Sequence, residues 1–475
     1  MKTNTRKTLA MSLAIFGCAA ANASAPAGGD PMQFPSYIQT VSAEFANAQA
    51  AKDAKLDIAP LPGNAAIACS CRWDDSCAAH LKKSTMMKEV GVKGSFYLVR
   101  KGALKKHDTR KLMDDGHAIG NHTISHKHME AISHDAAFRE IMEQRVCLEK
   151  DIGRTVTSYV SPFGWKTVNA NDADAQSKVR HMRSVLDSVV YGGHFVSQDG
   201  SPRWSRLDKS TWMWTNRFNS DDRHPNRQKF VEGFTSRRAA ALSNGVPRVT
   251  LGTHSWCNDE GTANQGKWLK EFFLAPDAVQ MNDWEYGAYR YSFIHGSVRK
   301  ISVNGNIATF EVKRYHPAFI GDEIPLSLLF SEKPVSVKAT TGGSAAVTVA
   351  KGERDTWTLP HDAAHTMPKK ISDAFPGLDI TVDPDEANGS LSVSMRNATG
   401  GELSDVTVVA VLPPKWNRRR CVEHCGRIAA GETHRVKFDC DGASGLTSQD
   451  EKPYYPVSID FSVGGSQIRV WHETR

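Results

Sequence analysis

Two histidines and a pair of acidic residues have the types and spacing of a metal site. His122 and His126 lie four residues apart, so that on a helical turn both imidazoles face one side and can bind one cation. The adjacent carboxylates of Asp74 and Asp75 can supply a third ligand and leave one carboxylate free as a base. Such a His₂Asp set leaves a position open for water or substrate, as in catalytic zinc sites. The alternative is that these are ordinary solvated side chains, since the chain has 18 histidines and further Asp-Asp pairs.

Residues that could do chemistry cluster at or just after the ends of predicted strands, in segments 73–76, 120–126 and 251–256. The apolar runs of strand length are 65–73, 94–99, 156–160 and 248–252. In parallel α/β folds the carboxyl ends of the strands meet at one edge of the sheet. We therefore expect the three segments to converge, although they are far apart in the sequence.

Helical stretches separate these predicted strands. In residues 134–150, Phe138, Ile141 and Met142 follow helical spacing, and Gly153 is a stop signal. The alternation of strands and helices over residues 56–296 predicts a parallel α/β architecture whose length suits a barrel.

The pattern changes after residue 297. Strand-like runs alternate with turn signals such as Asn304-Gly305 and Gly400-Gly401, and no strong helix is predicted. We expect a β module at 297–370 and a β-sandwich module at 371–475. Residues 24–55 are rich in alanine and are predicted to be a leader or linker.

The first 23 residues have the pattern of an export signal. Three basic residues precede the apolar run 9–21, and Ala21-Asn22-Ala23 offers small residues for cleavage. We expect a signal peptide over 1–23 and a secreted or periplasmic protein, with a lipoprotein anchored through Cys18 as the alternative. No other segment has 18 consecutive apolar residues, so no integral membrane segment is expected in the mature protein.

Composition excludes several classes of protein. The formal net charge is +7, and three basic residues lie in the export signal, so the mature chain carries +4. This excess is too small to predict nucleic acid binding. With 40% hydrophobic and 23% charged residues among 475, the chain is neither collagen, coiled coil nor disordered, and can bury a sizeable core.

Eight cysteines remain after the export signal, and an even number outside the cytoplasm predicts disulfide bonds. They are Cys69, Cys71, Cys77, Cys147, Cys257, Cys421, Cys425 and Cys440. The alternative for the last three is a zinc site with His424 and His434.

Together and in this order, the segments resemble the motifs of the polysaccharide deacetylase family (NodB homology, carbohydrate esterase family 4). Trp73-Asp74-Asp75-Ser76 is similar to the first motif, Thr-Phe-Asp-Asp-Gly, and His122-Thr123-Ile124-Ser125-His126 matches the second, His-Ser/Thr-x-x-His. Ser161-Pro162-Phe163-Gly164 resembles the end of the third motif, and 251–254 resembles the last. The resemblance covers about residues 60–295 and implies a NodB-like (β/α) barrel, followed here by β-sandwich modules.

The resemblance also implies roles for the site residues. Asp75, His122 and His126 would hold a divalent metal, usually zinc, although cobalt or nickel would also suit these ligands. Asp74 would be the general base, and His254 would be the general acid that protonates the leaving amine.

Substrate contacts are implied around the third and last motifs. The backbone N–H of Phe163 would help to hold the oxyanion, with Gly164 beside it. Trp165 and Trp256 neighbour motif residues and could stack on sugar rings. The alternative for any tryptophan is packing in the core.

Three departures from the family pattern mark a divergent member. Val160 stands where the family has an arginine that contacts the base, and Arg203, Arg206 or Arg217 could replace it. Ser76 replaces a glycine, and the fourth motif has no clear match.

The resemblance therefore implies a secreted, metal-dependent hydrolase that removes N-acetyl groups from 2-acetamido sugars of a polysaccharide or glycoconjugate. Cleavage of O-acetyl esters, as on xylan, is the first alternative. A carbohydrate-binding protein without activity is the second, but it would need neither the base Asp74 nor the acid His254.

Overall fold

The computed structural model describes residues 32–100, 102, 104–163, 184–190, 193–196, 213, 215–342, 345–414, 421–439 and 454–474. The predicted signal peptide, Cys18, Gly164 and Trp165 lie outside these residues. So do Arg203 and Arg206, two of the three proposed replacements for the missing motif arginine.

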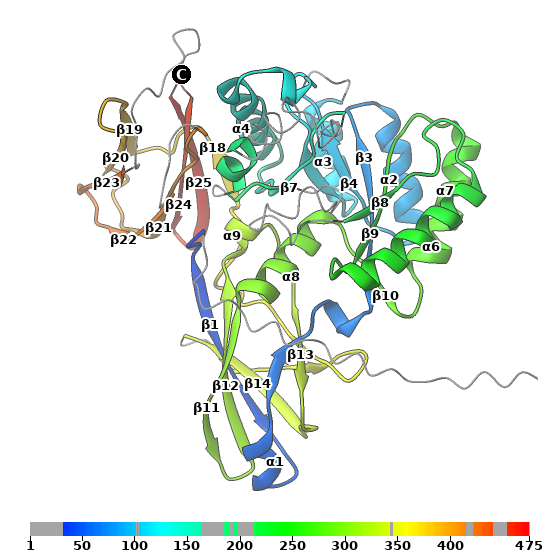
Figure 1. Ribbon diagram of the computed structural model, residues 1–475. Helices are drawn as coiled ribbons and strands as arrows, with labels where there is room; N and C mark the ends of the chain where they lie inside the picture. The colour runs from blue at the N-terminus through cyan, green and yellow to red at the C-terminus, as the bar shows by residue number, and fades with distance from the viewer. Residues whose placement is uncertain are drawn as a thin grey trace, which may run out of the picture.

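A parallel sheet forms the centre of an α/β domain (Figure 1). Its strand order is β7-β6-β5-β4-β3-β9-β8, and β10 pairs in parallel with the start of β3. The strands are β3 (Ile67–Asp74), β4 (Ser95–Leu98), β5 (Ala118–Asn121), β6 (Ser158–Tyr159), β7 (Phe195–Val196), β8 (Asn216–Phe218), β9 (Arg248–His254) and β10 (Ala278–Gln280). Every residue of β3 is buried, as expected for a parallel strand covered on both faces. The predicted parallel α/β architecture is confirmed.

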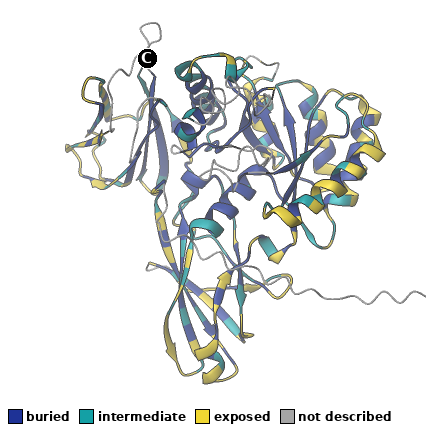
Figure 2. Ribbon diagram, viewed as in Figure 1, coloured by how far each residue is buried: buried dark blue, intermediate teal, exposed yellow. Residues whose placement is uncertain are grey.

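Helices connect and cover these strands. They are α2 (Ala79–Val90), α3 (Lys106–Asp114), α4 (His134–Ile152), α6 (Arg227–Asn244), α7 (Asp259–Phe273) and α8 (Asp283–His295), with short 3₁₀ turns at Pro62–Asn64 and Met129–Ala131. The side chain of Ser133 caps the start of α4, and Gly153 ends it with φ of 72°, which confirms the predicted helix and its stop. In Figure 2 the strands of the sheet are buried, whereas α6 and α7 expose their outer faces.

A β module lies beside the α/β domain. One sheet has the order β11-β12-β1-β14-β15 and the other β16-β17-β13-β2. The strands are β1 (Ser36–Glu44), β2 (Leu56–Ile58), β11 (Ser297–Asn304), β12 (Ile307–Tyr315), β13 (Leu326–Phe330), β14 (Ser336–Thr341), β15 (Val347–Thr348), β16 (Ala350–Lys351) and β17 (Trp357–Leu359); the helices are α1 (Ala48–Asp53) and α9 (Pro317–Ile320).

The N-terminal segment differs from the expected leader or linker. β1 lies in the middle of its sheet, where it pairs with β12 on one side and β14 on the other. Alternate side chains are buried, but one of them is the polar Gln39 and another is the small Ala43, which weakens the strand pattern in the sequence. Its strand conformation depends on partner strands about 270 to 300 residues away in the sequence.

A second β module, a sandwich, ends the chain. Its sheets have the orders β18-β25-β24-β21-β22 and β19-β20-β23. The strands are β18 (Lys370–Ser372), β19 (Leu378–Asp385), β20 (Ser390–Asn397), β21 (Leu403–Ala410), β22 (Val422–Ile428), β23 (Thr433–Asp439), β24 (Tyr455–Val463) and β25 (Ser466–Thr474). Apolar side chains from both sheets form one core, as the predicted β-sandwich requires.

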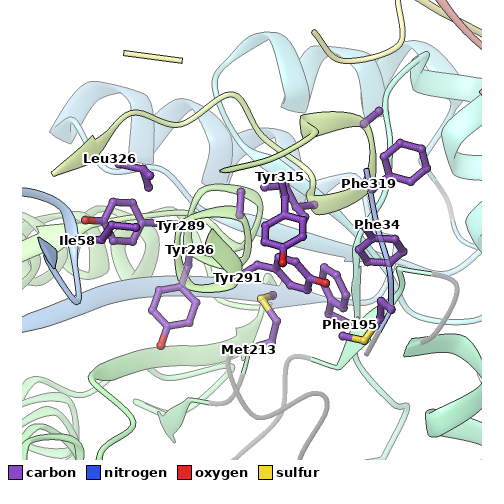
Figure 3. Packing of buried hydrophobic residues seen from close by; sticks show 14 of the residues in the cluster. Phe34, Ile58, Phe195, Met213, Tyr286, Tyr289, Tyr291, Tyr315, Phe319 and Leu326 are labelled. Carbon is purple, nitrogen blue, oxygen red and sulfur yellow. The ribbon is translucent and has the colours of Figure 1, made fainter. Parts of the chain in front are cut away.

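The β modules dock on the α/β domain through buried contacts. Glu149 of α4 accepts hydrogen bonds from Arg469 Nη1 at 3.1 Å and Trp471 Nε1 at 2.8 Å, both on β25. Figure 3 shows Tyr291 of α8 among the neighbouring aromatic rings, and its ring centroid lies 4.9 Å from that of Tyr315 on β12. The modules are therefore packed against the domain rather than joined only by a linker.

The cysteines do not follow the expected disulfide framework. Cys69, Cys71, Cys77, Cys147, Cys257 and Cys425 are unpaired thiols, so the expectation is wrong for these six. Cys440 lies outside the described residues. The alternative zinc site includes this cysteine and therefore stays a prediction. Among the described helices, none is both long and apolar enough to span a membrane.

Candidate active site

Three of the predicted residues converge at the carboxyl end of the sheet. Asp75 follows β3, whereas His122 and His126 lie in the loop after β5. His126 Nε2 is 3.0 Å and His122 Nε2 is 3.8 Å from Asp75 Oδ1. One ligand atom from each residue lies within 4.8 Å of the other two, so the three side chains can hold one metal ion.

The two histidines are held by a loop, not by the helical turn that their spacing suggested. Thr123 and His126 have φ of 70° and 57°, which excludes a right-handed helix. His122 Nδ1 lies 2.7 Å from the carbonyl oxygen of Val160, an arrangement that directs Nε2 toward Asp75. Glu140 of α4 accepts hydrogen bonds from the backbone N–H and the hydroxyl of Ser125, between the two histidines.

Strained backbone gathers around this site. Asp75, Phe163 and Asp221 also have left-handed φ values, of 72°, 60° and 81°. Non-glycine residues in this region cost of order 1 kcal/mol or more each, and they are retained where the surrounding structure enforces them. The surrounding structure therefore holds these residues in a backbone conformation that they would not adopt by themselves.

Arg72 holds the second carboxylate of the acidic pair. Its Nε lies 3.0 Å from Asp74 Oδ1 and its Nη2 lies 3.0 Å from Asp74 Oδ2, and both side chains are buried. Burial raises the pKa of Asp74, but the positive charge of Arg72 and a smaller contribution from His122 lower it to about 2. Asp74 is therefore ionised at neutral pH.

Sequence reasoning missed Arg72. The structure describes one of the three arginines considered before, Arg217, whose Nη2 donates to the carbonyl oxygen of Gly252, while its charge also lowers the pKa of Asp74. The sequence signal for this contact is the two-residue repeat of a β-strand. Arg72 and Asp74 lie two residues apart on β3 and therefore face the same side. The other departure, Ser76, exchanges two hydrogen bonds with the backbone of Val99 after β4.

His254 at the end of β9 approaches the site from the opposite side. Its Nε2 is 3.7 Å from Asp75 Oδ2, and its Nδ1 is 2.9 Å from Asp222 Oδ2. Burial lowers the pKa of His254, but the hydrogen bond to Asp222 and the charge of Asp74 outweigh burial and raise it. Asp222 also accepts hydrogen bonds from the hydroxyl of Thr253 and the backbone N–H of His254. The sequence analysis treated its Asp-Asp pair only as a chance occurrence.

Two exposed aromatic rings flank the site. Phe163 is 49% exposed and stacks on His128 at 3.8 Å, with its ring edge toward His126 at 4.6 Å. Trp256 is 48% exposed and stacks on His254 at 4.0 Å. Both rings therefore lie beside residues of the site.

The site therefore combines a place for a metal ion, an ionised carboxylate and a histidine whose pKa is raised. Such an arrangement can activate water, accept its proton and donate one to a leaving group.

The sequence profile of the polysaccharide deacetylase family matches residues 73–181. This segment contains Asp74, Asp75, His122 and His126, and the match confirms the resemblance that the motifs predicted. The α/β domain is that of a divergent polysaccharide deacetylase, a family of hydrolases.

Solved structures with some likeness include three enzymes. A family 4 carbohydrate esterase from Streptomyces lividans is 13% identical, with a TM-score of 0.29 over 46% of this chain and 92% of that one. A family 4 acetyl xylan esterase from Clostridium thermocellum, in complex with cobalt, is 17% identical, with a TM-score of 0.29 over 46% and 89%. The catalytic domain of a peptidoglycan N-acetylglucosamine deacetylase from Eubacterium rectale is 13% identical, with a TM-score of 0.32 over 45% and 91%. No curated protein matches the chain.

Proposed function

We propose that the protein is a secreted, metal-dependent deacetylase that removes N-acetyl groups from 2-acetamido sugars of a polysaccharide or glycoconjugate. The observation that carries this proposal is the placement of Asp74 and His254, partners on adjacent strands, next to the group formed by Asp75, His122 and His126. A hydrolase that cleaves an amide needs a base and an acid around the activated water. Asp74 is ionised at neutral pH, and the pKa of His254 is raised above its ordinary value.

Asp75, His122 and His126 would hold the metal, and their arrangement fits one. Asp75 Oδ1 is a buried oxygen without a hydrogen bond of normal geometry, although it faces both imidazoles. A cation between these groups would satisfy the oxygen, and two nitrogen ligands with one oxygen ligand suit zinc, cobalt or nickel. When bound, such an ion supplies a Lewis acid that lowers the pKa of water and polarises the acetyl carbonyl.

Asp74 acts as the base in this proposal. Because its carboxylate is ionised and held by two nitrogens of Arg72, it can accept the proton of the attacking water without first reorienting. Arg72 would thus do for Asp74 what the missing motif arginine at position 160 does in the family.

His254 acts as the acid. Its contact with Asp222 raises the pKa of the imidazole and orients Nε2 toward the site. The backbone N–H of Phe163 is the proposed donor to the oxyanion.

The acid also bears on the choice between amide and ester. An amide nitrogen leaves only when it is protonated, whereas an alkoxide is a better leaving group. A proton donor at His254 therefore meets a requirement of N-acetyl cleavage that O-acetyl cleavage has to a smaller degree. The non-catalytic alternative gives neither Asp74 nor His254 a role.

Acetate release tests the proposal directly. The purified protein would be incubated with N-acetylglucosamine and N-acetylgalactosamine polymers, peptidoglycan and O-acetylated xylan, with chelator or added zinc. Release from an amino-sugar polymer that chelator abolishes is expected. Release from xylan alone would establish the esterase instead, and metal-loaded protein that releases no acetate from any polymer would refute the proposal.

A further inference from the structure

Trp256, which stacks on the proposed acid His254, lines two hollows in the surface. The hollows have volumes of about 710 and 510 Å³, and Arg223, His224 and Trp256 line both. The larger one also contains Ser255 and Asn258. Each volume is in the range of small-molecule sites and can contain a sugar unit. Because Trp256 stacks on His254, a unit bound here would adjoin the unit that loses its acetyl group.

The charges around these hollows are balanced except at Arg223. Asp221 pairs with Lys229 at 3.2 Å and accepts the backbone N–H groups of Arg223 and His224. Asp222 pairs with His254 at 2.9 Å. No carboxylate of the described residues forms an ion pair with Arg223, whose side chain is exposed and lies 5.8 Å from the centre of the Trp256 ring.

We propose that Trp256 and Arg223 form a subsite for a neighbouring sugar unit that carries an anionic group. The inference rests on the proposed function and narrows its substrate class to acidic polymers. A guanidinium offers two parallel N–H donors that match the oxygens of a carboxylate or a phosphate. The indole ring provides an apolar surface for the sugar ring, and Arg223 provides the charge at its edge.

An acidic polymer fits the site better than a neutral one for an electrostatic reason. The exposed carboxylate of Asp221 is paired with Lys229 at 3.2 Å, which reduces its repulsion of an anion. Solvent and salt screen the charge of an arginine in a hollow less than that of an arginine on a convex surface. The charge of Arg223 therefore raises the local concentration of anionic ligands.

The test compares one polymer in two charge states. A polymer of alternating N-acetylhexosamine and uronic acid would be used intact and after chemical reduction of its carboxyl groups to neutral alcohols. A phosphodiester-linked N-acetylhexosamine polymer would show whether phosphate replaces carboxylate. Binding would be measured by calorimetry with chelator present, so that no turnover is needed, and kcat/KM would be measured with zinc.

We expect the intact polymer to bind about fivefold more tightly than the reduced one, and Arg223→Gln to remove that preference without weakening binding of the neutral polymer. Arg237→Gln removes an exposed charge on α6, outside the residues that line the two hollows. It is the matched control and should keep the preference. Equal binding of both charge states by the unaltered protein would overturn the inference, as would a preference that survives Arg223→Gln. Deacetylation of neutral polymers alone would preserve the proposed function and refute the acidic substrate, whereas zinc-loaded protein inactive on every polymer would refute the function itself.

Discussion

Arg72 and Asp74 face the same side of β3, and two nitrogens of Arg72 lie 3.0 Å from the two oxygens of Asp74. The strand itself creates this pairing, because alternate residues point to the same face. The proposed base is thereby held from its own strand, whereas position 160, where the family pattern has an arginine, is Val160.

Replacing Arg72 should impair turnover more than substrate binding. Arg72→Met leaves Asp74 as a buried charge without its main partner, which costs ~3–5 kcal/mol in comparable buried pairs. We expect kcat to fall at least tenfold with little change in KM, a lower Tm, and partial recovery in Arg72→Lys. A stable Arg72→Met protein with unchanged kcat would show that Arg72 does not position the base.

Asp74→Asn should abolish deacetylation while metal binding persists. The amide keeps the shape of the side chain but accepts no proton, so a loss of about 10²-fold or more in kcat is expected. Metal content would be measured by mass spectrometry in parallel, with Asp379→Asn, an exposed acid on β19, as a control outside the proposed site. Full activity of Asp74→Asn would remove Asp74 from the role of base.

His122→Ala should lose both metal and activity. His122 is buried and directed at Asp75 by the carbonyl of Val160, so its removal takes away one of the three proposed ligands. For the unaltered protein, chelator should lower Tm, because a ligand that binds only the folded state stabilises it. Zinc bound at one equivalent in His122→Ala would contradict the ligand assignment.

The role of the acid can be separated from the role of the base by the leaving group. In Asp222→Asn, His254 loses the negatively charged hydrogen-bond acceptor that raises its pKa. Deacetylation of an amino sugar should then fall by about 10²-fold, whereas hydrolysis of an aryl acetate, whose phenolate leaves without protonation, should change little. An equal loss on both substrates would indicate a structural role for Asp222.

Acid should destabilise the folded protein through His361, whose Nδ1 lies 2.9 Å from the hydroxyl of Tyr37. Burial, and then the charge of Arg314, lower the pKa of His361 to about 4. As the pH falls below about 6.5, the unfolded chain binds this proton before the folded one does, so the free energy of unfolding decreases until the pH reaches about 4. His361 should account for about 2 kcal/mol between pH 7 and pH 5. Urea unfolding of His361→Gln should show a smaller decrease than the unaltered protein, and an identical decrease would contradict the prediction.

Some features of this protein follow from its sequence alone. The apolar runs that became β3 and β9 end at Asp74 and His254, and parallel strands bring their carboxyl ends together whatever the details of packing. Helix α4 was predictable because its spacing and its stop at Gly153 are local properties. The order of the motifs then identified the family.

Other features depended on tertiary structure. Which acid meets His254, and whether His122 and His126 sit on a helix or in a loop, depend on backbone paths that only the packed sheet determines. β1 becomes a strand because β12 and β14 hydrogen-bond to both of its edges. Arg72 was visible in the sequence, yet its partner was certain only once β3 was seen to be buried along its length, where a charge needs a counter-charge. Local patterns thus predicted the elements, and long-range packing decided which charged groups meet.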